Sequence, residues 1–485
     1  MKKGKAAPRT LAGWDKKYVW HPFTQQAEWA AAEPLIVASA KGCDIIDAGG
    51  RKYLDGVSSL WVTVHGHNHP ALNAAVTAQL KKMAHTTFLG LTHEPAIRLA
   101  RALAQLAPPG LSRIFYSDNG STSVEVALKM AFQYWTRAPR KGPGTGPPKT
   151  EFLALRNSYH GDTLGSVSVG GIGLFHETFR PLLFRARFAM SPDCFRCPFR
   201  RNKDYAGRLR QGGGPPARKV PKPGDFRPET GCRWECLGSV AKTLKAGAGR
   251  LAAAVVEPAV QGAAGMIVMP PGYLRGFERL CRRHGVLLIA DEVATGFGRT
   301  GSMFAVDGEG VRPDFLCVSK SITGGYLPLA ATLTTEKIYR AFLGRYDEFK
   351  TFFHGHTYTA NPLACAAALA NLRQFRKDRL LASLPGKASL LSAALLRLRG
   401  DPHVGDVRQM GLMAAVELAE DAATGRPYPP GARMGRRVCD EARRRGVWIR
   451  PLGDAVVLMP PLAIPPARLQ FLLDVVRESI AAAVR

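Results

Sequence analysis

Two charged side chains stand at the ends of apolar runs, where a buried strand would finish. Asp291 follows the run 286–290, and Lys320 ends the segment 314–320. A carboxylate in such a place is costly unless a cation or a strong donor compensates it, and a lysine there is desolvated and can act as a nucleophile. Each has a plain alternative: Asp291 could cap a helix or pair with Arg299, and most lysines are solvated surface charges.

A third feature is a turn that could hold a phosphate group. Residues 117–122 follow another apolar run and open an amphipathic segment, with Gly120 and Ser121 at the turn. Glycine lets a ligand approach the backbone, and the first turn of a helix leaves N–H groups without partners. An ordinary capped turn has the same pattern. Together with Asp291 and Lys320, however, the turn meets the needs of pyridoxal 5'-phosphate: a phosphate clamp, an anion for the ring nitrogen and an amine for a Schiff base.

Two further segments carry side chains suited to the same ligand. Tyr159 follows the run 152–155 and begins the sequence Tyr-His-Gly-Asp-Thr, and its ring could cover a planar cofactor. Residues 353–362 offer hydroxyls and small residues, which suit a second set of phosphate contacts. Without the other features, either segment is typical of a plain turn.

The elements that must position these residues alternate along the chain. Amphipathic segments such as 121–135 predict helices, and the stretch 455–465, broken by prolines, predicts a buried strand and a turn. Short apolar runs between the helices are typical of buried parallel strands. Such alternation predicts an α/β fold with a mostly parallel sheet, which binds ligands beyond the carboxyl ends of its strands. The apolar runs are 113–116, 152–155, 251–256, 286–290 and 315–318.

The chain of 485 residues combines a globular composition with an unusual charge. It is 46% hydrophobic and 22% charged, which excludes a wholly disordered, collagen-like or coiled-coil protein. Its net charge of +29 invites a nucleic-acid or membrane-surface interpretation. Part of this charge is local, because residues 185–250 contain 16 basic and 5 acidic residues. Two stretches rich in Gly and Pro, 139–150 and 211–225, are expected to be exposed loops.

The cysteines bear on location and on a metal site. Nine cysteines are too few for a disulfide scaffold, and their number is odd. We therefore expect a reducing, cytoplasmic location, because no segment has the roughly 18 apolar residues of a membrane span and the N-terminus lacks the apolar core of a signal peptide. Four cysteines in the basic segment 185–250 could hold a structural zinc ion or be free thiols. These are Cys194, Cys197, Cys232 and Cys236.

Over most of its length the chain resembles the class III, fold-type I aminotransferases, most closely the biotin-pathway members that aminate 8-amino-7-oxononanoate. The stretches rich in Gly and Pro fall outside the match. The motifs that carry the resemblance are Trp-His-Pro-Phe-Thr-Gln at 20–25, Gly-Val-Ser-Ser-Leu-Trp at 56–61, His-Gly-His-Asn-His-Pro at 65–70, Tyr-Ser-Asp-Asn-Gly-Ser at 116–121, Tyr-His-Gly-Asp-Thr at 159–163, Glu-Pro at 257–258, Gln-Gly at 261–262, Asp-Glu-Val-Ala-Thr-Gly-Phe-Gly-Arg-Thr-Gly at 291–301, Lys320, and Asn-Pro-Leu-Ala-Cys at 361–365.

The resemblance implies roles for the residues around the cofactor. Lys320 would form the Schiff base with pyridoxal 5'-phosphate and then move the proton, and Asp291 would pair with the pyridine nitrogen. Gly120 and Ser121 would hold the phosphate. Tyr159 would stack on the cofactor and contact the substrate. These active sites lie at a homodimer interface, so the neighbouring subunit would add two further phosphate contacts, His356 and Thr357.

The resemblance also implies a substrate site. Arg408 matches the family arginine that binds the carboxylate of the oxononanoate, and Gly355 matches a glycine that contacts substrate. Many members that use S-adenosylmethionine as amino donor have Trp-Trp where this chain has Leu60-Trp61, and tyrosine where it has Phe23. They also have Gly-Pro-Thr rather than Gly-His-Thr at 355–357. These versions look more like members that use lysine as donor. S-adenosylmethionine is still expected, since it is the commoner donor, and lysine is a serious alternative.

The fold and reaction that follow from the resemblance are specific. A large cofactor domain would span 86–375, with the basic, cysteine-bearing insertion at about 190–240, and a smaller α+β domain would combine 1–85 with 376–485. The enzyme would convert 8-amino-7-oxononanoate to 7,8-diaminononanoate by ping-pong kinetics through pyridoxamine phosphate. The alternatives are an ornithine or 4-aminobutyrate aminotransferase of the same class, and a non-catalytic nucleic-acid-binding protein on this fold. We expect neither a membrane nor a nucleic-acid partner.

Overall fold

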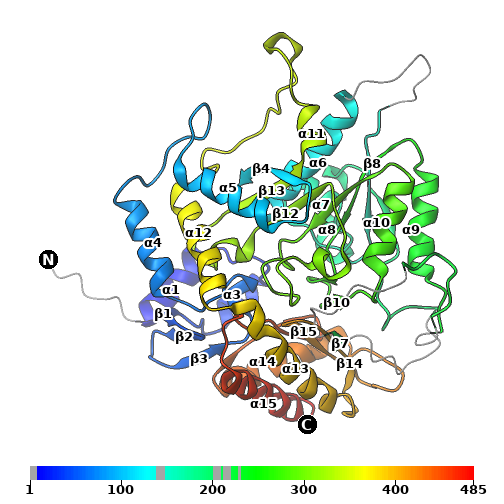
Figure 1. The fold of residues 1–485 in the computed structure, drawn as a ribbon. Coiled ribbons are helices and arrows are strands. Elements are labelled where there is room, and N and C mark those ends of the chain that lie inside the picture. The colour runs from blue at the N-terminus through cyan, green and yellow to red at the C-terminus, as the bar shows by residue number, and fades with distance from the viewer. Residues whose placement is uncertain (1–7, 138–147, 200–208, 211–219, 228–230) are drawn as a thin grey trace.

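The structure is a computed structural model that describes residues 8–137, 148–199, 209–210, 220–227 and 231–485 (Figure 1). Most of the two stretches rich in Gly and Pro therefore lies outside the described residues. Among the described residues, none of the helices has the length and apolar character needed to cross a membrane.

A seven-stranded sheet forms the centre of the molecule, in the order β4-β13-β12-β11-β8-β5-β6. The pairs along β12-β11-β8-β5-β6 are parallel, and only β13 runs antiparallel to its neighbours. The mostly parallel sheet predicted from the apolar runs is thus confirmed. Its strands are β4 (Leu111–Ser117), β5 (Glu151–Leu155), β6 (Arg187–Ala189), β8 (Leu251–Val256), β11 (Leu287–Asp291), β12 (Phe315–Val318) and β13 (Ala330–Thr335).

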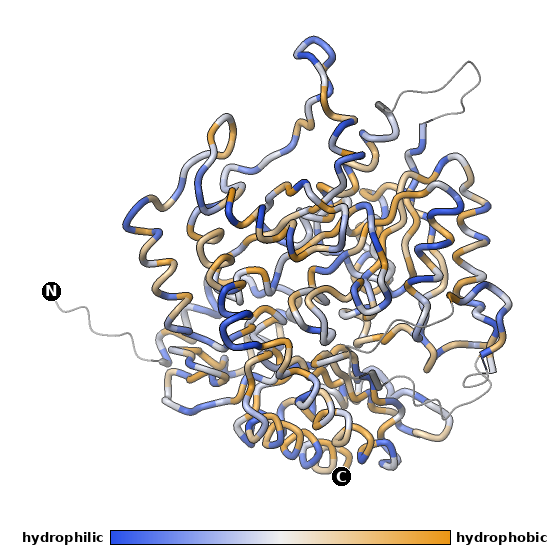
Figure 2. The backbone as a smooth tube through the Cα atoms, in the orientation of Figure 1, coloured by the Kyte–Doolittle hydropathy of each residue, from blue (hydrophilic) through white to orange (hydrophobic). Residues whose placement is uncertain are grey.

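Both faces of this sheet are buried, which explains why its strands are apolar throughout rather than alternating. In β11, Leu287 and Ile289 pack with the cluster around α6, whereas Leu288 and Ala290 join the larger core on the other face. Hydrophobic residues accordingly follow the strands in Figure 2. The helices against the sheet are α5 (Glu94–Leu106), α6 (Gly120–Arg137), α9 (Glu235–Ala246), α10 (Tyr273–Arg283) and α11 (Glu336–Arg340).

Two smaller sheets join the ends of the chain. β3 pairs in parallel with β16, so N-terminal and C-terminal segments share one sheet at the lower side of Figure 1. The other sheet has the order β17-β18-β15-β14-β7, and its last strand comes from the predicted insertion. The strands are β1 (Val37–Lys41), β2 (Asp44–Asp47), β3 (Lys52–Asp55), β7 (Leu209–Arg210), β14 (Val404–Met410), β15 (Met413–Leu418), β16 (Val447–Trp448), β17 (Arg450–Leu452) and β18 (Ala455–Leu458).

The β3-β16 pairing agrees with a small domain built from both ends of the chain, and β18 confirms the strand predicted within 455–465. The domain limits at 85 and 375 stay a prediction. The remaining helices cover the sheets and connect them: α1 (Pro8–Tyr18), α2 (Gln26–Ala31), α3 (Ser58–Trp61), α4 (Pro70–Leu80), α7 (Leu164–Ser168), α8 (Gly173–His176), α12 (Pro362–Lys377), α13 (Leu380–Leu398), α14 (Met434–Arg444) and α15 (Pro466–Ala483).

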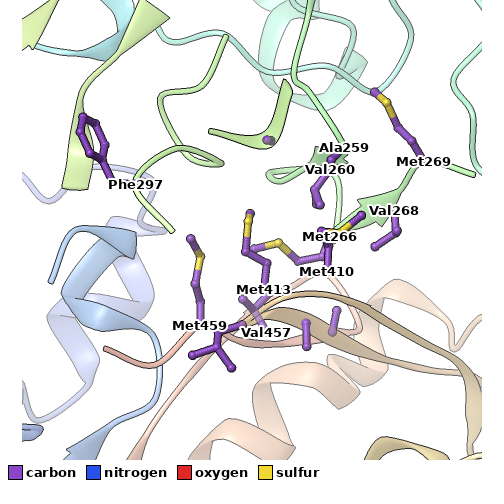
Figure 3. Packing of buried hydrophobic residues seen from close by; sticks show 14 of the residues in the cluster. Ala259, Val260, Met266, Val268, Met269, Phe297, Met410, Met413, Val457 and Met459 are labelled. Carbon is purple, nitrogen blue, oxygen red and sulfur yellow. The ribbon is translucent and has the colours of Figure 1, made fainter. Parts of the chain in front are cut away.

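A methionine-rich part of the core joins the large sheet to the C-terminal sheet. The hairpin of β9 (Val260–Gln261) and β10 (Ile267–Val268) follows β8 and packs on the C-terminal strands. Figure 3 shows Met266, Met410, Met413 and Met459 gathered at this junction. Methionine is flexible and fills irregular gaps, which suits an interface between two sheets of different origin.

Candidate active site

A cavity of about 700 Å³ lies where the carboxyl ends of the parallel strands meet. Asp291 ends β11, Lys320 follows β12, Tyr159 follows β5, and the first turn of α6 follows β4. Strand topology therefore brings together residues that are distant in sequence, and the helix α3 adds two more, of which Trp61 contacts Ser321, 260 positions later. The predicted residues that line the cavity are Leu60, Trp61, Gly120, Ser121, Tyr159, Asp291 and Lys320.

Asp291 is compensated by a histidine. Its side chain is 4% exposed, and Oδ2 lies 2.7 Å from Nδ1 of the fully buried His160 side chain. The backbone N–H of Val293 donates to Oδ1 at 3.0 Å. Arg299, the alternative partner considered from the sequence, instead donates to Ser58 and to two backbone carbonyls. Asp291 is thus held as a hydrogen-bonded carboxylate beside the cavity.

Lys320 occupies a strained turn directly after β12. Its backbone has φ +34, in the left-handed region that costs a non-glycine residue about 1–2 kcal/mol. The buried amide of Asn371, on α12, holds this turn by donating to the carbonyls of Ser321 and Ile322, both at 2.9 Å. Burial lowers the pKa of Lys320, although Asp291 and Glu257 oppose the shift. The amine therefore loses its proton more readily than a solvated lysine.

The first turn of α6 presents N–H groups and a hydroxyl to the cavity. Gly120 and Ser121 occupy this turn, whose N–H groups have no partner within the helix. The Ser121 hydroxyl contacts Thr163 Oγ1 at 2.8 Å and accepts the Thr163 N–H at 3.0 Å. The start of α6 thus offers N–H groups beside two hydroxyls, whereas the N–H groups of Gly165 and Ser166 in α7 donate to Glu125. The start of α6 favours an anion such as phosphate.

Glu257 fixes the backbone on two sides of the cavity. One carboxylate oxygen accepts the N–H of Tyr159 at 3.0 Å, and the other accepts the N–H of Gly262 at 2.9 Å. The Tyr159 hydroxyl donates to Asp162 at 2.7 Å, which sets the direction of its ring. Burial raises the pKa of Glu257 to about 7, with Asp291 adding to the rise and His160 opposing it. Glu257 is therefore a carboxylate that can change protonation near neutral pH.

Trp61 closes the side of the cavity opposite the strands. Its ring lies 5.5 Å from the Lys320 amine and packs closely on Gly262. Ser58, Ser59 and Trp61 all have positive φ, so this short segment is held in a strained shape. The fully buried Arg299 supports this segment by donating to Ser58 Oγ at 3.2 Å. It also donates to the carbonyl of Pro460, in the C-terminal region, at 2.8 Å.

The other predicted residues lie outside the cavity lining of this single chain. Phe23 is 65% exposed and packs edge-on against Phe175, whose ring in turn meets Tyr159. His356 Nδ1 lies 2.7 Å from Oδ2 of the cavity residue Asp118. Gly355 and Thr357 are exposed next to it.

Arg408 is buried beside the cavity rather than in its lining. It is 3% exposed, and Nη1 pairs with Glu417 and with Asp406 Oδ2, the latter at 3.2 Å. Nη2 donates at 2.7 Å to the carbonyl of Gly265, in the hairpin that supplies Ala263 to the lining. Burial lowers the pKa of Arg408, but Glu417 and Asp406 outweigh this and raise it. The buried Nε–H makes no hydrogen bond in the described structure.

Sequence reasoning assigned no role to two important residues, His160 and Glu257. Both belong to motifs that were recognised, but neither residue was given a chemical role of its own. Glu257 directly follows β8, so the reasoning that identified Asp291 at the end of a strand would also have found it. The pairing of His160 with Asp291 joins residues 131 positions apart, and no local pattern announces it.

The four cysteines of the basic segment form no disulfide bonds, and two of them contact Arg227. The Arg227 guanidinium donates to the sulfurs of Cys194 and Cys232 at 3.6 and 3.8 Å. Within the part of the chain that the structure describes, no group of three or more His, Cys, Asp or Glu side chains is arranged to hold a metal ion. The zinc hypothesis has no support from this geometry.

Comparison with known proteins identifies relatives of similar length. Residues 25–480 match the family model for class-III aminotransferases. A protein of Geobacter sulfurreducens named adenosylmethionine-8-amino-7-oxononanoate aminotransferase is 50% identical, with 97% of each chain covered. One of the same name from Nitratidesulfovibrio vulgaris is 52% identical over 98% of this chain and 83% of its own length.

Solved structures are similar over the whole chain. A crystal structure of adenosylmethionine-8-amino-7-oxononanoate aminotransferase from Methanocaldococcus jannaschii has a TM-score of 0.87 and 39% identity, covering 98% of this chain and 99% of its own. An omega-transaminase from Thermomicrobium roseum, 31% identical, has a TM-score of 0.86 and covers 99% of this chain and 100% of its own.

Proposed function

Because the chain belongs to the class III aminotransferase family, we propose that it transfers an amino group to 8-amino-7-oxononanoate, forming 7,8-diaminononanoate in biotin biosynthesis. One observation carries the chemistry: a lysine amine, a compensated carboxylate and a helix N-terminus meet in one cavity. The substrate is supported by the names of relatives that are about half identical over nearly the whole chain.

The enzymes of this family, this chain included, depend on pyridoxal 5'-phosphate. The donor set of the cavity fits that cofactor. The α6 turn with Gly120 and Ser121 suits its phosphate, Asp291 suits a protonated ring nitrogen, and Lys320 suits its aldehyde. When bound, the cofactor supplies a carbonyl that takes up the amino group and a ring that accepts the electrons of a broken C–H bond.

The protein's own residues then bind, orient and move protons. We assign to Lys320 Nζ the removal and return of the proton at the reacting carbon, since burial keeps its amine easily deprotonated. The pairing of Asp291 with His160 maintains a negative charge where the ring nitrogen needs one. Tyr159, fixed by Asp162 and Glu257, covers one side of the site. Trp61 limits access of water from the other side.

We assign the substrate carboxylate to Arg408. Its buried Nε–H lacks an acceptor among the described residues, so an anion that reaches it would satisfy a donor that otherwise costs free energy. Phe23, Leu60 and Gly355 are proposed to line the outer part of the substrate site. Leu60 lies in the cavity wall, and Phe23 and Gly355 are exposed near or beyond its mouth.

The amino donor has two candidates. S-adenosylmethionine is supported by the names of the relatives. Lysine is supported by residues of this chain, since Phe23, Leu60 and His356 differ from the versions typical of many users of S-adenosylmethionine. Both donors carry an α-amino or ω-amino group and a carboxylate, so the cavity chemistry alone favours neither.

We further propose a cytoplasmic homodimer in which each subunit completes the other's site. Exposed apolar side chains such as Trp20, Leu89, Tyr346 and Phe353 support a protein interface on this chain. His356 and Thr357 would then reach the partner's phosphate site. The cytoplasmic location is supported by the nine cysteines, all of which are free thiols.

A half-reaction assay tests the proposed reaction. The holoenzyme is mixed separately with S-adenosylmethionine, lysine, 4-aminobutyrate and ornithine, and the cofactor absorbance is followed. We expect conversion by S-adenosylmethionine or lysine, and return of the original spectrum on adding 8-amino-7-oxononanoate. Conversion by 4-aminobutyrate or ornithine alone would show that the substrate is wrong. A salt-sensitive gel shift with DNA, without any cofactor absorbance, would favour the non-catalytic alternative.

Subunit mixing tests the shared site. Lys320→Ala should abolish transamination, whereas Lys337→Ala, an exposed lysine of α11, should not. A hybrid of one Lys320→Ala subunit and one subunit with Thr357→Ala and His356→Ala should regain one complete site if these residues act across the interface. Hybrids with no more activity than either parent would contradict that arrangement.

A further inference from the structure

Arg408 is one of two arginines that share a single carboxylate. Glu417, on β15, contacts Arg408 Nη1 through Oε2 and Arg196 Nη2 through Oε1. The Arg408 and Glu417 side chains are 3% and 11% exposed, whereas the Arg196 side chain is 45% exposed. Arg196 belongs to the cysteine-bearing segment at about 190–240 and lies 221 residues before Glu417 in the chain. The ion network therefore connects that segment to the arginine we assign to the substrate carboxylate.

The charges of this cluster show why a second arginine matters. Arg408 contacts two carboxylates, Asp406 and Glu417. Asp193 also acts on Arg408 and brings a third negative charge near it. A substrate carboxylate would be repelled by such a cluster. Arg196 adds the positive charge that offsets Glu417 from its other side.

The segment around Arg196 is built to keep it there. Asp193 Oδ1 accepts the N–H groups of Phe195 and Arg196 at 3.0 and 3.2 Å, which folds the chain into a tight turn. The Phe195 ring lies against Gly405 at the start of β14, so closely that a Cβ at that glycine would be 3.2 Å from it. Cys194 accepts a hydrogen bond from Arg227 at 3.6 Å. The turn and the Phe195 ring thus dock the segment on the sheet that carries Arg408, and the contact of Cys194 with Arg227 joins two parts of the segment.

We propose that Arg196 is a positioning residue that keeps Arg408 available to a substrate carboxylate by sharing Glu417. This inference rests on the proposed role of Arg408. Without Arg196, Glu417 would bind Arg408 alone and compete more strongly with the incoming carboxylate. Burial raises the pKa of Glu417, but Arg408 and Arg196 outweigh it and lower the pKa, so Glu417 is ionised at neutral pH. The cysteine-bearing segment would then serve substrate recognition, although it lies outside the cavity lining.

Matched substrates with and without the charge test the proposal. Arg196→Gln is compared with the wild type on 8-amino-7-oxononanoate and on its methyl ester, which differ only in the carboxylate. We expect KM for the acid to rise about fivefold, the upper range for a partly exposed ion pair, with kcat and the KM for the ester unchanged. The rise should shrink at high salt, because Arg196 is partly exposed. An unchanged KM for the acid, or an equal rise for the ester, would overturn the proposal.

Three further variants make the result specific. Arg196→Lys keeps the charge and should restore most of the affinity. Arg233→Gln, an exposed arginine of the same segment, should have no effect. In a Glu417→Gln background, Arg196→Gln should add little, because its action passes through Glu417. Full additivity of the two substitutions would contradict that route.

The same assay separates this proposal from the proposed function. If Arg408→Gln raises the KM for the acid and Arg196→Gln does not, the inference is wrong and the role of Arg408 stands. If Arg408→Gln affects acid and ester alike, the carboxylate site is wrong and the inference falls with it. If the wild type aminates neither compound, the proposed substrate is wrong. The comparison is then repeated with 4-aminobutyrate and its methyl ester. Arg196→Gln must again raise KM for the acid and leave KM for the ester unchanged.

Discussion

Two buried carboxylates at neighbouring strand ends have different partners and therefore different chemistry. Asp291, after β11, lies beside the imidazole of His160, whereas Glu257, after β8, accepts two backbone N–H groups. A hydrogen bond to a carboxylate favours its charged form, and burial disfavours that form. This difference assigns Asp291 to charge compensation and Glu257 to backbone positioning.

Replacing His160 tests the support of Asp291. His160→Gln removes a ring nitrogen that lies 2.7 Å from the carboxylate and can carry positive charge. Hydrogen bonds to charged groups contribute about 1.5–3 kcal/mol, so kcat should fall at least tenfold while the chain stays folded. Steady-state kinetics and the pH dependence of the cofactor spectrum would measure this. His403→Gln, whose histidine pairs with Tyr428 away from the cavity, is the control. Equal kcat values for the two variants would refute the role.

The protonation of Glu257 predicts a pH dependence of stability. Its pKa in the folded chain is about 7, above the ordinary value of 4.5, so the folded state holds the proton more tightly than the unfolded state. The contribution of this proton to the free energy of unfolding is complete below about pH 4.5 and is lost as pH rises through about 7. Glu257→Gln should remove this loss, which amounts to roughly 3 kcal/mol.

Unfolding of the apo protein in urea between pH 5 and pH 8 would measure the effect. The free energy of unfolding of Glu257→Gln should fall less over this range than that of the wild type. The exposed Glu33→Gln serves as control and should follow the wild type. Parallel pH profiles for wild type and Glu257→Gln would rule out a raised pKa.

At the scale of elements, the site depends on how two turns are held. The turn at Lys320 keeps a positive φ because Asn371 of α12 binds its carbonyls. The start of α6 approaches Val293, after β11, so closely that only glycine fits at position 120. The helices thus do more than cover the sheet, because they fix the distance between the phosphate turn and the lysine.

Gly120→Ala tests this close approach. A Cβ at Gly120 would lie 2.5 Å from Val293 Cγ1, so either Val293 or the start of α6 must move. Overpacking of this kind costs about 1–3 kcal/mol, and we expect the affinity for pyridoxal 5'-phosphate to fall about tenfold. Titration of the apo protein with the cofactor would measure it. Gly238→Ala in α9, where no heavy atom lies within 4 Å, should keep full affinity; loss of affinity there too would point to a general effect on folding.

At the scale of the whole molecule, the cavity lies where three parts of the chain meet. Arg299, from the large-sheet region, donates to Ser58 and Thr63 near the N-terminus and to Pro460 near the C-terminus. The Met-rich core in Figure 3 joins the same regions by apolar packing. Stability and site geometry are therefore coupled.

Arg299→Met should lower both stability and activity. The substitution leaves the buried carbonyls of Thr63 and Pro460 without their donor, at a cost of about 3 kcal/mol or more. It also releases the strained segment that carries Trp61. Thermal unfolding and kcat would both be measured. Arg98→Met, which removes an exposed ion pair with Glu94, should change stability by less than about 0.5 kcal/mol. Similar Tm values for the two variants would contradict the linking role of Arg299.

Local patterns in the sequence determined five strands of the central sheet, the helix after 120 and the strand-end residues Asp291 and Lys320. Each of these depends on a few consecutive residues, because burial on both faces requires an uninterrupted apolar run. Strands β6 and β13 were not expected, since β6 has only three residues and the sequence Ala-Ala-Thr-Leu-Thr-Thr of β13 is less apolar than the other strands. The resemblance of the motifs then identified the family and the cofactor.

Only the tertiary structure decided how charges are paired. The contacts of His160 with Asp291, and of Glu417 with both Arg408 and Arg196, join residues that are distant in sequence. It also decided that the cysteine-bearing segment docks on the C-terminal sheet. The physical reason is that a buried charge is stabilised by whatever lies within a few ångströms, and which group lies there depends on the packing of the whole chain rather than on local sequence.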